Sequence, residues 1–93
     1  MSARYTKEDL AFYFRQGMQK GATHMIIVYQ QTGATHGVID KNDRHYYVQS
    51  GEDPRAVVAA LLAQIPGFKE LLEVYNLGLP AEPQLNAAYA YNF

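Results

Sequence analysis

The sequence predicts an α+β fold: an N-terminal helix, a two- or three-stranded antiparallel sheet, two C-terminal helices and an extended arm. Three observations predict it. The short stretch Met25–Tyr29 carries apolar residues on both faces, which is typical of a central strand. Signals for the start of a helix precede apolar stretches at Thr6 and at Asp53. Pro80 and Pro83 then favour an extended chain near the C-terminal end.

The chain has 93 residues, a formal net charge of -1 and no cysteine. We expect one domain over residues 1–78 and an aromatic arm over 79–93, packed on that domain or on a partner subunit. The lack of cysteine excludes disulfides and thiolate metal sites and fits a cytoplasmic protein. No apolar run reaches about 18 residues, so we expect neither a signal peptide nor a membrane span. The near-zero charge weighs against nucleic-acid binding.

The first helix is expected to begin after Thr6. Thr6 is a good N-cap residue, and Asp9 stands three residues later, where a capping box places an acidic side chain. Leu10, Phe14 and neighbouring apolar residues recur at helical spacing, so one face of the helix should be buried. Lys20 followed by Gly21 favours the end of the helix.

The sheet is expected to be an antiparallel meander. The stretch Met25–Tyr29 is the first strand, residues 35–40 are the second and residues 45–49 are the third. Turn-forming residues separate them at 32–34 and at 41–43. Glycines weaken the middle strand, and if it is a loop instead, the first and third strands pair directly.

Two helices should follow the sheet. Asp53 and Pro54 form a favourable start, and apolar residues between 57 and 65 give the first of these helices a buried face. Pro66-Gly67 ends it. Phe68, Leu71, Leu72 and Tyr75 have the i, i+3, i+4, i+7 spacing of a second helix. Residues 85–93 are then a short helix or an extended arm.

The amino-acid sequence of several segments resembles that of a group of small bacterial and phage-type proteins without an assigned activity. The resemblance rests on the GATHMIIV stretch at residues 21–28, on GEDPR at 51–55 and on LEVYNL at 72–77. An acidic stretch that the group carries after its first strand is largely missing here. The resemblance implies an α/β fold and an accessory role on a phage or other mobile element. It implies no catalytic residue.

One polar cluster suggests metal chemistry. His36, Asp40, Asp43 and His45 carry side chains that zinc accepts as ligands, and His24 could lie nearby. Their spacing matches no metal-binding signature, however, and Asp and Asn are common in turns for their backbone hydrogen bonds. We therefore predict solvated turns, with no metal, no cofactor and no catalytic residue. A small metal-dependent enzyme that uses these four residues is the alternative.

The aromatic residues give the strongest signal outside the core. The chain has eight tyrosines and no tryptophan, and tyrosine suits contact surfaces as well as cores. The candidates for an interface are Phe12, Tyr46, Tyr47, Tyr89, Tyr91 and Phe93. The sequence predicts a non-catalytic cytoplasmic interaction protein that forms a homodimer and binds a further protein partner. A weak single-stranded nucleic-acid binder, with bases stacked on Tyr46 or Tyr47, is a second alternative.

Overall fold

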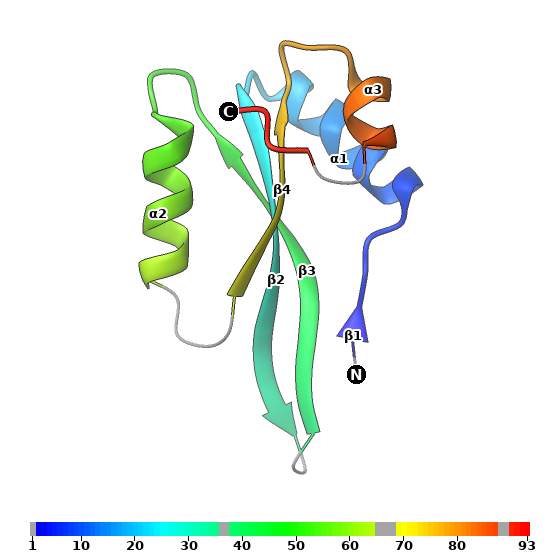
Figure 1. The fold of residues 1–93 in the computed structure, drawn as a ribbon, viewed down its shortest axis with the longest axis vertical. Helices are drawn as coiled ribbons and strands as arrows, with labels where there is room; N and C mark the ends of the chain where they lie inside the picture. The colour runs from blue at the N-terminus through cyan, green and yellow to red at the C-terminus, as the bar shows by residue number, and fades with distance from the viewer. Residues whose placement is uncertain (1, 36–37, 65–68, 88–89) are drawn as a thin grey trace.

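A computed structural model of the chain describes residues 2–35, 38–64, 69–87 and 90–93 (Figure 1). The predicted α+β class is confirmed, with an N-terminal helix, antiparallel strands and further helices. In chain order the elements are β1 (Ser2–Ala3), α1 (Lys7–Gln19), β2 (His24–Thr35), β3 (Val38–Val48), α2 (Pro54–Gln64), β4 (Lys69–Asn76) and α3 (Ala81–Asn86). Among the described residues, no helix has the length and apolar character needed to cross a bilayer.

The sheet has the strand order β1-β3-β2-β4, so β2 is an interior strand with β3 on one side and β4 on the other. Both of these pairings are antiparallel, and β1 adds two residues in parallel beside β3. The predicted central strand is confirmed, because Met25 and Ile26 are 0% exposed and Ile27 and Val28 only 1%. Side chains alternate across a strand, so Met25 and Ile27 pack below α1, and Ile26 and Val28 pack against α2. Figure 1 shows the two helices on opposite sides of the sheet.

The start of α1 follows the predicted capping box. The Thr6 hydroxyl accepts a hydrogen bond from the Asp9 N–H at 3.1 Å, and the Asp9 carboxylate accepts one from the Thr6 N–H at 2.9 Å. Leu10, Phe14 and Gly17 are buried against the sheet. The helix ends at a left-handed Gly21, with φ of 75°, as the Lys20-Gly21 pair predicted.

The predicted meander is wrong, because residues 24–35 and 38–48 form two long strands that pair antiparallel with each other. Residues 32–34 lie within β2 and residues 41–43 lie within β3, so neither forms a turn. The first and third predicted strands pair directly, with Met25 opposite Tyr47, which was the alternative arrangement. At a register shift between Gln31 and Gly33, Thr32 is an extra residue in β2. His36 and Gly37, between the two strands, lie outside the described residues.

The helix predicted over residues 68–75 is wrong, because β4 occupies Lys69–Asn76. A register shift in the pairing with β2 falls between Leu71 and Glu73, so Leu72 is an extra residue in the strand. As a result Leu71 packs with Val74 on the α2 face, and Leu72 packs with Tyr75 on the α1 face. The two residues of each pair are three positions apart, which is also the spacing of residues on one face of a helix. This spacing explains why the sequence predicted a helix.

Helix α2 begins as predicted. Pro54 is its first residue, and the Asp53 side chain accepts a hydrogen bond from the Arg55 N–H at 3.0 Å. The predicted end at Pro66-Gly67 lies outside the described residues. The C-terminal arm contains α3 and then returns to the sheet, where Tyr91 forms a parallel bridge with Val74. The arm therefore contacts β4 of its own chain.

Candidate functional site

The two edges of the sheet differ in how their backbone groups are paired. In an antiparallel ladder, successive residues direct their N–H and C=O groups alternately to one side and the other. Leu77 N–H donates to Thr23 C=O, and Thr23 N–H donates to Val48 C=O, which fixes this alternation. On β4, after the register shift, the outward residues are then Val74 and Asn76. On β3 they are His45, Tyr47 and, just after the strand, Gln49.

At Val74 and Asn76 the edge formed by β4 is covered by the C-terminal arm. Val74 N–H donates to Ala90 C=O at 2.6 Å, and Val74 C=O accepts from Asn92 N–H at 2.9 Å. At Asn76 the partner is one buried side chain, the amide of Gln84. Its oxygen accepts from Asn76 N–H at 2.7 Å, and its nitrogen donates to Asn76 C=O at 2.9 Å. Gln84 therefore replaces a neighbouring strand at this position.

The edge formed by β3 is covered at Gln49 and at Lys41–Asn42, and it is open between these two places. At one end Glu52 caps Gln49: its carboxylate accepts the Gln49 N–H at 2.8 Å, and its own N–H donates to Gln49 C=O at 3.1 Å. At the other end β1 pairs with Lys41 and Asn42. Within the part of the chain that the structure describes, the outward N–H and C=O groups of His45 and Tyr47 have no partner. We call residues 45–47 the open edge.

An aromatic wall stands beside the open edge on the α1 face. The imidazole of His45 stacks on the Tyr13 ring, with 3.9 Å between centroids and 21° between planes. Tyr47 meets His45 edge-on at 5.5 Å, and its hydroxyl donates to the Tyr13 C=O at 2.7 Å. The Tyr5 hydroxyl lies 2.8 Å from His45 Nδ1. Contacts with Tyr5 and Tyr13 therefore fix the side chains of His45 and Tyr47, the two residues with free backbone groups.

In this wall the side chains of His45 and Tyr5 are held in their neutral forms. Burial, followed by the positive charges of Lys20 and Arg44, lowers the pKa of His45 below its ordinary value. Burial, followed by the nearby Tyr13, raises the pKa of Tyr5. Both groups are therefore neutral at physiological pH, and the Tyr5 hydroxyl shares a hydrogen bond with His45 Nδ1. This wall suits an uncharged partner surface.

Asp43 fastens the N-terminal segment to β3. Its carboxylate accepts a hydrogen bond from the Tyr5 N–H at 2.8 Å. Its other oxygen lies 2.9 Å from Arg4 Nε, an ion-pair contact without aligned hydrogen-bond geometry. The Arg4 guanidinium also lies over the Tyr29 ring, 4.5 Å from its centroid. These contacts position Tyr5 beside the open edge.

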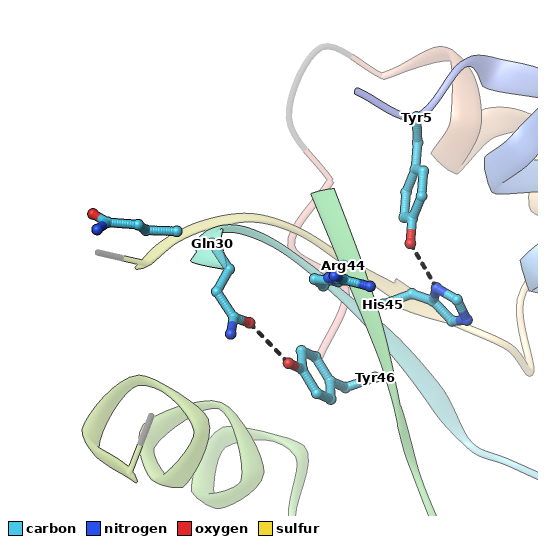
Figure 2. A pocket seen from close by; sticks show the side chains of 6 residues that line it. Tyr5, Gln30, Arg44, His45 and Tyr46 are labelled. Atoms are coloured by element: carbon cyan, nitrogen blue, oxygen red, sulfur yellow. Dashed lines mark hydrogen bonds between the residues drawn. The ribbon is translucent and has the colours of Figure 1, made fainter. Parts of the chain in front are cut away.

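A groove of about 510 Å³ lies along the same part of β3, and both faces of the sheet contribute to it. Figure 2 shows Tyr5 and His45 on one side of β3, and Tyr46 with Gln30 on the other. The Tyr46 hydroxyl donates to the Gln30 side-chain oxygen at 2.9 Å, and Arg44 is exposed. The groove therefore combines free backbone groups, aromatic rings and one exposed cation.

The predicted metal ligands are not brought together in the described part of the chain. Asp43 and His45 share a face of β3, but Arg4 and Tyr5 already engage them. His24 lies at the far end of β2, paired with Val48 and Asn76. No group of three or more His, Cys, Asp or Glu side chains among the described residues could hold a metal ion. His36 and the side chain of Asp40 lie outside the description.

The predicted interface residues are spread over three places. Tyr46 and Tyr47 lie on the open edge and point to opposite faces, as predicted. Phe12 is 48% exposed on α1, edge-on to Tyr13. Tyr91 is 49% exposed beside β4, and Phe93 packs on the α2 face under Arg55. Tyr89 lies outside the described residues.

Sequence reasoning missed the open edge and the contributions of Tyr5, Tyr13 and His45 to its wall. The signal available was period-2 alternation through residues 43–47, which predicts that Asp43, His45 and Tyr47 share a face. Comparison with known proteins finds no family model, no curated protein and no solved structure that matches the chain. The resemblance to small bacterial and phage-type proteins therefore stays a prediction.

Proposed function

We propose that this protein is a non-catalytic interaction module that binds an extended segment of another polypeptide by strand addition at the open edge. The observation that supports it is the contrast between the two edges. The arm and Gln84 satisfy the outward groups of Val74 and Asn76, whereas those of His45 and Tyr47 lack partners among the described residues. Exposed strand edges pair with other chains unless they are blocked.

The chemistry of the open edge suits a polypeptide better than a small reactive substrate. Two outward residues offer two N–H donors and two C=O acceptors, the groups that an added strand uses. The flanking rings of Tyr5, Tyr13 and Tyr46 provide large, rigid and uncharged contact area. A net charge of -1 and the neutral wall give no large electrostatic field, so backbone pairing and aromatic contact would supply the affinity.

The test begins with a library of random linear peptides screened against the intact protein. We expect selected peptides to slow amide exchange and shift the amide signals at His45 and Tyr47. The amides of Val74 and Asn76 should not respond, because they already have partners. Peptides that perturb other sites, or His45 and Tyr47 amides that exchange slowly in dilute free protein, would contradict the proposal.

A pair of variants separates backbone pairing from side-chain contact. His45→Pro removes an outward N–H, a change that edge strands tolerate, and should weaken peptide binding by at least about tenfold. His45→Ala removes the same imidazole but keeps the N–H, so it is the matched control and should bind within a few-fold of the native chain. Equal binding by the two variants would show that the N–H of His45 is not used.

The cytoplasmic location and the association with a phage or mobile element belong to this proposal as predictions from the sequence. A protein expressed with a fluorescent tag in its host should distribute through the cytoplasm.

A further inference from the structure

We propose that the segment bound at the open edge is β3 of a second copy of this chain. Two β3 strands would pair antiparallel about a two-fold axis at Tyr46, joining two four-stranded sheets into one continuous sheet. The inference rests on the proposed function, because it requires strand addition at residues 45–47. It goes beyond that function by naming the occupant, the register and the residue on the axis.

The free groups select a single register. Outward residues must face outward residues for hydrogen bonds to form between two antiparallel edges. If His45 of one copy faces Tyr47 of the other, and the reverse, all the free groups of both copies pair and four hydrogen bonds form. A shift by two residues in one direction requires Gln49, which Glu52 already caps. A shift in the other direction requires Asp43, next to the residues that β1 covers.

The same register places matching side chains together. Tyr46 faces its own copy at a pair without hydrogen bonds, where opposing Cα atoms lie only about 4.5 Å apart. Both Tyr46 rings lie on the α2 face, each already held by Gln30. On the other face, His45 of one copy faces Tyr47 of the other, which repeats the His45–Tyr47 ring contact inside each chain. Aromatic cross-strand pairs are stabilising in antiparallel sheets.

Helix α1 leaves room for this arrangement. Its Gly17 lies against both the Tyr47 ring and the Leu77 side chain, which places α1 above β2 rather than above β3. Strands in a sheet are about 4.8 Å apart, so each α1 axis would lie about 7 Å from the two-fold axis. The two helices would then be about 14 Å apart, wider than helix packing at 8–10 Å. The aromatic walls of the two copies would line the space between them.

Charges at the ends of the paired segment are complementary. In this register Gln49 of one copy faces Asp43 of the other. Glu52, which caps Gln49, is thereby brought to the level of Arg4 and Arg44 of the second copy. Arg4 is bound to Asp43 but its side chain is 58% exposed, and Arg44 is exposed. Two acidic side chains, Glu52 and Asp43, and two basic side chains, Arg4 and Arg44, would meet at each end of the pairing.

The test uses a property unique to a residue on a two-fold axis. Light scattering should show a dimer of the native chain at about 100 μM, and dilution should dissociate it. Tyr46→Lys and Tyr46→Glu should each be monomeric, because each variant would bring like charges together on the axis. An equal mixture of the two should again form a dimer, and mixing cannot repair a variant that is merely misfolded. Circular dichroism of each variant checks that it folds.

Two variants with one cysteine each check the register directly, since the native chain has no cysteine. Tyr46→Cys should form a covalent dimer under mild oxidation, because the expected Cα separation suits a disulfide. Gln30→Cys, on the same face but on the interior strand β2, is the matched control and should form no covalent dimer under the same oxidation.

A native chain that is monomeric at about 100 μM would overturn the dimer, and so would charge variants that remain dimeric or fail to recombine. If the chain is monomeric but selected peptides still protect His45 and Tyr47, strand addition stands and the second copy is not its occupant. If peptides and the second copy both leave these amides unprotected, the proposed function fails as well.

Discussion

Replacing Gln84 by methionine should remove the side-chain amide that pairs with the outward backbone groups of Asn76 on β4. Gln84 is 5% exposed, and its amide uses its full hydrogen-bonding capacity. Its oxygen accepts from Asn76 N–H at 2.7 Å and from the Asn92 side chain at 3.1 Å. Its nitrogen donates to Asn76 C=O at 2.9 Å and to Pro80 C=O at 3.0 Å. Methionine has a similar length and volume but makes none of these bonds.

The expected cost follows from these four hydrogen bonds. Each contributes about 0.5–1.5 kcal/mol net, and water will replace part of the loss at an edge position. We therefore expect the free energy of unfolding to fall by about 2–4 kcal/mol. That is a large fraction of the stability of a small domain.

Urea denaturation of the two chains measures this difference, and amide exchange locates it. Asn76 should lose its protection through local opening, whereas Ile26, on the interior strand, should lose only as much protection as the fall in the free energy of unfolding explains. Gln64→Met, at the exposed end of α2, is the matched control and should change stability by less than about 0.5 kcal/mol. If Gln84→Met costs as little as this control, the amide does not stabilise the edge and the reasoning is refuted.

Three further changes test the core and the wall. Ile27→Ala, at a 1% exposed position, should lower the free energy of unfolding by about 2–4 kcal/mol in urea, and a loss below about 0.5 would mean that β2 is peripheral. Gly17→Ala would place a methyl 2.7 Å from both the Tyr47 ring and Leu77, and should cost about 1–2 kcal/mol in thermal melts despite the higher helix propensity of alanine. The lowered pKa of His45 means that the unfolded chain binds its proton first, so stability should fall as pH decreases below about 6.5. His45→Gln should flatten that dependence in urea melts at pH 5 and 7.5, and an unchanged slope would contradict the assignment.

The parts of the fold that local chemistry determines were predictable from the sequence. The starts of α1 and α2 depend on residues within one turn of each other, Thr6 with Asp9 and Asp53 with Pro54. The buried strand was predictable because Met25–Tyr29 is apolar on both faces. The class of the fold followed from these elements.

The errors arose where distant contacts override local preference. Residues 41–43 have the composition of a turn, yet they stay in β3. Asp43 is held there by Arg4 and Tyr5, which precede it by almost forty residues. The extra residue in β4 similarly changed a strand pattern into a helical one, and the pairing of β4 with β2 decided the outcome. No local rule contains either constraint.

The candidate site was only half predictable, for a related reason. Tyr46 and Tyr47 were predicted to point to opposite faces because that follows from strand geometry alone. Whether their strand lies at the edge of the sheet depends on how the whole chain is ordered, and so does the wall that Tyr5 and Tyr13 form. The alternative metal set required its four residues to converge, and three of them, Asp40, Asp43 and His45, lie along the extended strand β3.

The residues of the open edge support the proposal that it is an interface. Proteins that keep an edge free in a monomer place lysine, proline or an inward-pointing charge on it. Here the two open residues are His45 and Tyr47, and the residue between them is Tyr46, so none of these protections is present. The same chain covers the outward groups of Val74 and Asn76 on its other edge with a returning arm and a buried amide. Because unpaired strand edges tend to pair with other chains, the proposed partner strand at residues 45–47 would give His45 and Tyr47 the partners that Val74 and Asn76 already have.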